Sequence, residues 1–343
     1  MYKAYAQYAL DKTLELLAID SPTGYTAEAA EKIKNEFLLL GCKAYITEKG
    51  GVAAEIGGRD DKNALLLEAH ADTLGGMVCE IKRTGALKLT PLGGLCAANC
   101  ETENCRVITK SGKIYEGTVQ LHDPSLHVNG ESRSKERTFD TVEVILDENV
   151  KNAEDVKALG IRNGDIVCME PRTRVTASGY IKSRFLDDKL SVGIILGFAK
   201  YLKDNSIEPE RKIYVHITVY EEVGHGAAAC PFTGVTEALS VDMGCVGNGL
   251  ECTERQVSIC AKDSGGPYAY DMVKKLIAAA EKTGADYAVD VYPHYGSDVE
   301  ATLRSGNDFR HGLIGAGVFA SHGYERSHIS GVENTIKLLA GLV

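Results

Sequence analysis

The sequence predicts an α/β sheet domain interrupted by a small β-barrel. Both ends of the chain alternate strand-like apolar runs with segments in which apolar residues recur every three or four positions, as in amphipathic helices. The middle of the chain holds short β-type segments separated by glycine turns. We therefore expect an α/β domain built from residues 1–74 and 181–343, with residues 75–180 inserted as a barrel.

The two flanks carry the alternating pattern in order. Residues 5–19 and 26–40 are predicted helices, and ALLLEAH (64–70) is a continuous apolar run typical of a buried strand. After residue 180 the pattern predicts helices at 188–202, at 270–282 and from 332, a helical turn from Asp298, and strands at 212–220, 238–242, 288–292 and 312–318. This order favours one discontinuous sheet domain.

The middle of the chain has the pattern of a barrel. Segments such as MVCEIKRTGALKLT and CRVITKSGKIYEGTVQL place strand-forming residues on both sides of glycine-containing turns. A helix-like segment at residues 153–159 interrupts them. Because the α/β pattern resumes afterwards, the barrel is expected to be an insertion and not a tandem domain.

Composition and charge exclude several classes of partner. The 343 residues include 38 Lys and Arg and 48 Asp and Glu, which gives a net charge of −10. Nucleic acids and anionic membranes require clustered basic residues, so we expect neither as a partner. The N-terminus lacks the features of a signal peptide, and no segment approaches the ~20 apolar residues of a membrane span. We therefore expect a cytoplasmic protein.

Ten cysteines occur without any C-x-x-C pair. A chain of this length can build its core without disulfides, which favours reduced thiols. Cys96, Cys100 and Cys105 cluster in a glycine-rich stretch, where a zinc site is one interpretation and incidental thiols are the other. Their spacing matches no common zinc pattern.

Acidic and imidazole side chains stand at the ends of several predicted strands and before one helix. They are His70 and Asp72, Asp187 and Asp188, Glu221 and Glu222, Asp242, and His322 and His328. Taken singly, each pair has a structural interpretation, such as a helix N-cap at Asp187 or a solvated strand end. Because ligand sites in open α/β sheets gather at the carboxyl ends of strands, we expect these groups to converge.

This set of groups suits divalent metal ions. Zinc, cobalt and manganese accept such nitrogen and oxygen ligands without any thiolate. Two ions would offset the charge of four or five converging acids, whereas one would leave it poorly compensated. A metal-bound histidine usually has its second nitrogen held by a carboxylate, so His70 is a candidate ligand and Asp72 its orienting group. Asp187 could bridge two ions with its two oxygens.

Seven fragments resemble, in order, the tetrahedral aminopeptidases, the FrvX-like glutamyl aminopeptidase group of dinuclear metallopeptidases that is sometimes mislabelled endoglucanase or cellulase M. They are HADTLG, FLDDKLSVG, VYEEVGHGA, VDMG, KDSGGPY, GSDVEATL and SHGYERSH. The resemblance covers essentially the whole chain. It implies a phosphorylase/hydrolase-like mixed-sheet α/β/α metallopeptidase domain, an inserted barrel that makes dimer contacts, and dimers that build twelve-subunit shells.

The resemblance also implies a site and an activity. One metal would have the ligands His70, Asp187 and Asp242, and a second the ligands Asp187, Glu222 and His328. Glu221 would be the general base, Asp72 would orient His70, and the peptide bond between Asp187 and Asp188 would be cis. The implied activity is removal of N-terminal residues from short peptides by a homo-oligomer with two zinc or cobalt ions per subunit, or manganese.

Three alternatives stay open. A deacylase of N-acyl amino acids would use the same metals and base but would have nothing to receive a free amine. A glycoside hydrolase needs two carboxylates at a fixed separation and no metal, so the histidines argue against it. A non-catalytic shell subunit would tolerate loss of the base, whereas Glu221 is present. Side-chain selectivity is expected to depend on residues 292–298 and 312–321.

Overall fold

The computed structural model describes residues 1–343 as two compact units. One comprises Met1–Asp72 and Arg172–Val343, and the other comprises Thr73–Pro171. The second boundary falls earlier than expected, because β10 (Arg174–Val175) and β11 (Tyr180–Ser183) pair with the sheet of the larger unit. The α/β domain with an inserted barrel that the sequence predicts is confirmed.

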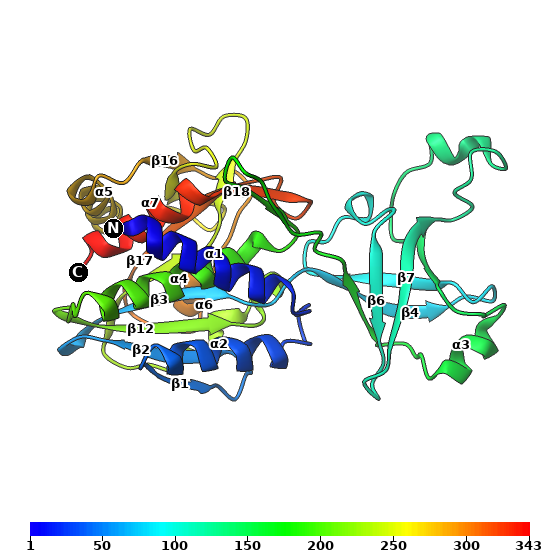
Figure 1. Cartoon of the computed structure of the whole chain (residues 1–343), viewed down its shortest axis with the longest axis horizontal. Helices are drawn as coiled ribbons and strands as arrows, with labels where there is room; N and C mark the ends of the chain where they lie inside the picture. Colours follow the sequence, from blue (N-terminus) through cyan, green and yellow to red (C-terminus); the bar gives the residue numbers. More distant parts are fainter. The chain divides into compact units, whose positions relative to one another are not determined.

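A 12-stranded mixed sheet forms the middle layer of the larger unit (Figure 1). Its strands follow the order β1-β2-β12-β3-β13-β17-β18-β11-β10, and β14, β15 and β16 extend it from β17. Besides β10 and β11 they are β1 (Lys43–Ile46), β2 (Val52–Gly57), β3 (Asp60–His70), β12 (Arg211–Thr218), β13 (Val235–Val241), β14 (Gly244–Val246), β15 (Val257–Lys262), β16 (Tyr287–Val291), β17 (Arg310–Phe319) and β18 (Glu325–His328). The central strands β12, β3, β13 and β17 are parallel, so their carboxyl ends share one edge.

Helices lie on both faces of this sheet. Figure 1 shows α1 and α4 over the near face and α6 behind β3. The helices of the larger unit are α1 (Tyr2–Leu17), α2 (Ala27–Leu39), α4 (Leu186–Asp204), α5 (Tyr270–Thr283), α6 (Asp298–Arg304) and α7 (Ile329–Gly341), with short 3₁₀ turns at η3 (Glu221–Val223) and η4 (Gly226–Ala228). No helix of the chain is both long and apolar enough to cross a membrane.

The core of the larger unit forms where the predicted apolar faces meet. Leu65, Leu66 and Leu67 of β3 are almost completely buried, as the continuous apolar run requires. The central helix α4 is covered on nearly all sides, and its apolar residues, Ile194 and Phe198 among them, belong to the same core cluster. Burial of each such side chain stabilises the fold by roughly 1.5–3 kcal/mol. The N-terminal end of α4 is thereby held rigidly at the carboxyl edge of the sheet.

The smaller unit is a closed six-stranded barrel with the order β4-β5-β8-β7-β6-β9. Its elements are β4 (Gly75–Ile81), β5 (Leu87–Leu92), η1 (Ala97–Asn99), β6 (Asn104–Ile108), β7 (Ile114–Leu121), η2 (Gly130–Arg133), β8 (Val142–Leu146), α3 (Ala153–Leu159) and β9 (Ile166–Met169). Cys96, Cys100 and Cys105 lie in this unit without disulfides, and none belongs to a cluster with metal-ligand geometry. The structure thus gives no support to a zinc site there.

Candidate active site

The carboxyl ends of the four central parallel strands deliver most of the predicted functional groups to one place. His70 is the last residue of β3 and is paired with Thr218, the last residue of β12. Glu221 follows Thr218 by three residues. Asp242 directly follows β13, and His322 follows β17 by three residues. The acids of α4 join them from the start of that helix. The expected convergence at strand ends is therefore observed.

Asp187 lies between two imidazoles. Its Oδ1 is 3.1 Å from Nε2 of His70, and its Oδ2 is 3.5 Å from Nε2 of His322. Glu222 Oε2 lies 3.7 Å from the same nitrogen of His322. Each oxygen of Asp187 thus faces the imidazole nitrogen of a different histidine. A carboxylate that bridges two cations presents its two oxygens in the same way, one to each cation.

Two ligand-atom clusters meet at His70. One contains His70, Asp187 and Glu222, and the other contains His70, Asp188 and Asp242. Asp188 was not predicted as a ligand, and its Oδ2 accepts a hydrogen bond of 3.2 Å from the backbone N–H of His70. The peptide bond between Asp187 and Asp188 is cis, as the family resemblance implied.

Glu325 holds two of these groups by their backbone. This fully buried carboxylate accepts hydrogen bonds from the N–H of Asp187 at 3.1 Å and from the N–H of His322 at 3.0 Å. The backbone of His322 has a φ of 61°, in the left-handed region that residues other than glycine rarely adopt. Glu325 stands between the two histidines of SHGYERSH, yet nothing in the sequence pattern distinguished it from a surface acid.

Asp72 is fully buried, and its carboxylate ties three segments together. Its Oδ2 accepts a hydrogen bond of 2.7 Å from the hydroxyl of Thr23, and its Oδ1 accepts one of 3.1 Å from the backbone N–H of Glu221. Nδ1 of His70 lies 2.9 Å from the backbone oxygen of Asp72 and 3.6 Å from its carboxylate. Asp72 therefore orients His70 mainly through its carbonyl group, while its carboxylate positions Glu221.

His328 lies elsewhere, which corrects the expectation that it completes the second metal site. Its Nε2 donates a hydrogen bond of 2.8 Å to the carbonyl of Ser178, and its Nδ1 accepts one of 3.0 Å from the N–H of Ser330 at the start of α7. Both ring nitrogens of His328 are therefore engaged in hydrogen bonds: Nδ1 caps the start of α7, and Nε2 contacts the backbone at Ser178. His322, the other histidine of the same fragment, occupies the position beside Asp187 and Glu222.

The electrostatics of the cluster favour bound cations. Burial raises the pKa values of Glu221 and Glu222, and burial together with Asp187 raises the pKa of Asp242 to about 7. Burial would lower the pKa of His70, but the carboxylates around it, Glu221 foremost, hold that pKa well above its usual value. Without cations these acids would compete for protons, because burial penalises their charged forms.

Two buried oxygens give a second indication that the residues present fit metal ions. Oε1 of Glu222 and Oδ1 of Asp188 have no hydrogen-bond partner. A buried polar atom without a partner costs ~1–3 kcal/mol, and more when it is charged. Both atoms belong to the clusters around His70, where nitrogen and carboxylate-oxygen donors suit zinc, cobalt or manganese.

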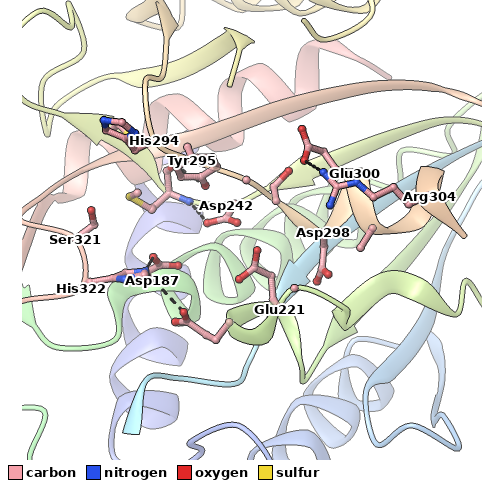
Figure 2. Close-up of a pocket in the computed structure, with 17 residues that line it drawn as sticks. Asp187, Glu221, Asp242, His294, Tyr295, Asp298, Glu300, Arg304, Ser321 and His322 are labelled. Carbon is pink, nitrogen blue, oxygen red and sulfur yellow. Dashed lines mark hydrogen bonds and ion pairs between the residues drawn. The ribbon is translucent and has the colours of Figure 1, made fainter. Parts of the chain in front are cut away.

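A cavity of about 460 Å³ opens beside the cluster (Figure 2). The predicted residues Asp187, Glu221, Glu222 and Asp242 line one part of it. Its other walls include His294, Tyr295, Ser297, Glu300, Arg304 and Ser321. His294 and Tyr295 lie in the segment 292–298, for which a role in selectivity was expected. Glu300 and Arg304, on α6, lie just beyond it.

The two histidines of SHGYERSH allow a matched test. His322→Asn is expected to lower the metal content by about one ion per chain, because the imidazole beside Asp187 and Glu222 is lost. His328→Asn should retain the full metal content, since asparagine is itself a good helix N-cap. Metal analysis of both purified variants after dialysis decides; full retention by His322→Asn and loss by His328→Asn would restore the original assignment.

Comparison with solved structures defines the class of protein first. The TET1 peptidase of Pyrococcus horikoshii has a TM-score of 0.84 with this chain at 23% identity, covering 97% of this chain and 98% of that one. A TET aminopeptidase from a marine sediment Thaumarchaeota archaeon has a TM-score of 0.87 at 18% identity, covering 98% and 96%. This likeness shows that the chain shares their fold, an α/β sheet domain with an inserted barrel.

Comparison of sequences then identifies the family. The M42 glutamyl aminopeptidase family matches residues 50–338, and the putative aminopeptidase YhfE of Bacillus subtilis is 43% identical over 325 residues, 95% of this chain and 94% of that protein. The chain belongs to the M42 glutamyl aminopeptidase family. The resemblance drawn from the seven fragments is confirmed, and so is the predicted aminopeptidase activity. The family is metal-dependent, in agreement with the ligand clusters at His70.

Proposed function

We propose that this aminopeptidase removes N-terminal residues from short peptides with two divalent ions per subunit. His70, Asp187 and Asp242 would hold one ion, and Asp187, Glu222 and His322 the other. The observation that carries the proposal is the position of Asp187, whose two oxygens face two different imidazoles at one end of an open cavity. Two ions would also compensate the buried oxygens Oε1 of Glu222 and Oδ1 of Asp188, which have no hydrogen-bond partner.

The reaction needs a water molecule that is deprotonated near neutral pH and a carbonyl that is polarised. Divalent ions held by these ligands would supply both, since they lower the pKa of water toward ~7 and act as Lewis acids. Glu221 lines the cavity and is the group placed to accept the proton at its carboxylate. Asp72 fixes the backbone of Glu221, so that the same carboxylate can afterwards deliver the proton to the leaving amine.

Selection of the N-terminus would follow from the charge of the cluster. A free α-amine is a cation or a lone-pair donor, and either form is attracted by an assembly of carboxylates and metal ions. A deacylase would instead have to place a neutral acyl group at the same position. Five carboxyl groups gather there, those of Asp187, Asp188, Glu221, Glu222 and Asp242, which favours the amine.

Acetylation of the substrate amine is the experiment that tests this choice. We expect kcat/KM for a dipeptide to fall at least ~100-fold when its N-terminus is acetylated, because loss of a buried charged contact costs ~3 kcal/mol. The free and the acetylated dipeptide are compared under saturating zinc or cobalt. Equal or faster cleavage of the acetylated form would establish a deacylase and leave the metal site untouched.

The identity of the metal is proposed from the ligand atoms of the site, and the oligomeric state from the similar solved structures. Nitrogen and oxygen ligands without thiolates support zinc or cobalt, with manganese as a third option. Two of the similar solved structures are described as a dodecamer and as a tetrahedron or octahedral shell, which supports a homo-oligomer, dimers joined through the barrel and a twelve-subunit assembly. Ten cysteines without a disulfide and an acidic composition support a cytoplasmic location.

A further inference from the structure

Two of the seven fragments, KDSGGPY and GSDVEATL, supply no metal ligand, yet the fold brings them together. Asp263 of the first is fully buried; its Oδ1 accepts a hydrogen bond of 2.9 Å from the N–H of Gly265, and its Oδ2 accepts one of 2.5 Å from the hydroxyl of Tyr268. Glu300 of the second packs against the same loop, beside Asp263, and lines the cavity. A pair of carboxyl groups is therefore built into the wall of the cavity.

The loop of KDSGGPY is shaped around Glu300. A Cβ atom on Gly265 would lie 1.7 Å from Oε1 and 2.2 Å from Cδ of Glu300, which leaves no room for any side chain at position 265. Only 13% of the Glu300 side chain is exposed. Burial and the neighbouring Asp263 raise the pKa of Glu300 to about 7. The carboxyl group is thus held in place, and Asp263 beside it disfavours its charged form.

Glu300 forms an ion pair with Arg304, one turn further along α6. Its guanidinium lies 2.8 Å from Oε2 of Glu300, but 69% of its side chain is exposed. Such a solvated pair contributes little and gives way readily. Figure 2 shows Glu300 and Arg304 on one side of the cavity, with Ser321 and His322 on the other. Because this ion pair is exposed to solvent, a cation of the substrate in the cavity can compete with Arg304 for Glu300.

We propose that Glu300, backed by Asp263, receives the cationic side chain of the substrate's N-terminal residue, so that the enzyme prefers lysine or arginine there. This inference rests on the proposed aminopeptidase function. The α-amine is bonded to the carbon next to the scissile carbonyl and must stay beside Glu221 and the metal ligands. A long basic side chain is the part of the same residue that extends across the cavity to the other wall.

The test compares kcat/KM for the p-nitroanilides of lysine, leucine and glutamate. We expect the wild-type enzyme to favour lysine over leucine at least ~10-fold, as a charge-assisted hydrogen bond in a partly buried site provides. Glu300→Gln should reduce this ratio at least ~10-fold, because the neutral amide keeps the shape and loses the charge. Arg304→Gln should raise the ratio, since a competing cation is removed.

Glu333→Gln is the matched control. Glu333 forms the same kind of i,i+4 pair with Lys337 on α7, at 3.2 Å and outside the cavity, so the ratio should not change in this variant. A wild-type preference for glutamate that Arg304→Gln abolishes, or no preference between lysine and leucine, overturns the inference even if Glu300→Gln does not fold. If none of the three anilides is cleaved while an N-acetyl amino acid is, the proposed function itself has failed.

Discussion

Asp187→Asn is expected to release both metal ions and to lower kcat/KM by at least ~10³-fold. Each oxygen of Asp187 faces a different imidazole, that of His70 or that of His322, so one substitution removes a negative ligand from both ion positions. The amide also turns an N–H donor toward one of them, where a cation would lie. Loss of Lewis-acid chemistry at a peptide bond costs several kcal/mol of transition-state stabilisation.

Metal content per chain after dialysis against metal-free buffer is the decisive measurement. Asp290→Asn is a suitable control, because Asp290 is also a buried carboxylate that accepts backbone hydrogen bonds, from Glu251 at 2.8 Å and Cys252 at 3.1 Å, and lies outside the cluster. The control variant should retain its ions. If Asp187→Asn also keeps two tightly bound ions, Asp187 does not bridge them and the ligand sets need revision.

The parts of the fold that were predictable are those in which a single physical constraint sets the pattern. The apolar run of β3 ends in His70, and the run of β13 ends just before Asp242, so strand ends and candidate ligands were recognised together. The periodic helices were also located within a few residues; the predicted helix 188–202 corresponds to α4. Burial imposes these regularities, and they can be read without tertiary contacts.

The distinction between His322 and His328 could not be read from the chain. They lie six residues apart in one fragment; His322 lies in the turn after β17, and His328 is the last residue of β18, which pairs antiparallel with β17. Which histidine returns to the cluster depends on where that turn falls, and on Glu325, which fixes the backbone of His322 from within the turn. A local pattern does not contain this information, because the anchor is a tertiary contact with Asp187.

Glu300 and Arg304 in the cavity wall were missed for a related reason. Glu300 is an ordinary helix residue by sequence, three positions after Ser297, and its Arg304 partner is the usual i,i+4 surface pair. Its significance arises from contact with Asp263 and Gly265, which lie more than thirty residues earlier. Selectivity depends on such long-range contacts, whereas the catalytic groups stand at strand ends that the sequence marks clearly.

Glu221→Gln is expected to lower kcat by ~10³–10⁴-fold while both metal ions stay bound. Glu221 belongs to neither ligand cluster, although its Oε2 lies 3.7 Å from Nε2 of His70. Its backbone N–H is tied to Asp72, which fixes the direction of the side chain into the cavity. Glutamine preserves this shape but cannot accept and return a proton, and general acid–base catalysis contributes ~10²–10⁴-fold.

Single-turnover and steady-state kinetics separate this role from the alternatives. KM should change by less than ~3-fold, because the group acts on the transition state and not on the bound substrate. Glu222→Gln provides the contrast: it should lose metal, since Glu222 belongs to the cluster with His70 and Asp187. A Glu221→Gln enzyme that loses an ion would make Glu221 a ligand. One that keeps both ions and more than a tenth of the wild-type kcat would place the base on another residue of the cavity.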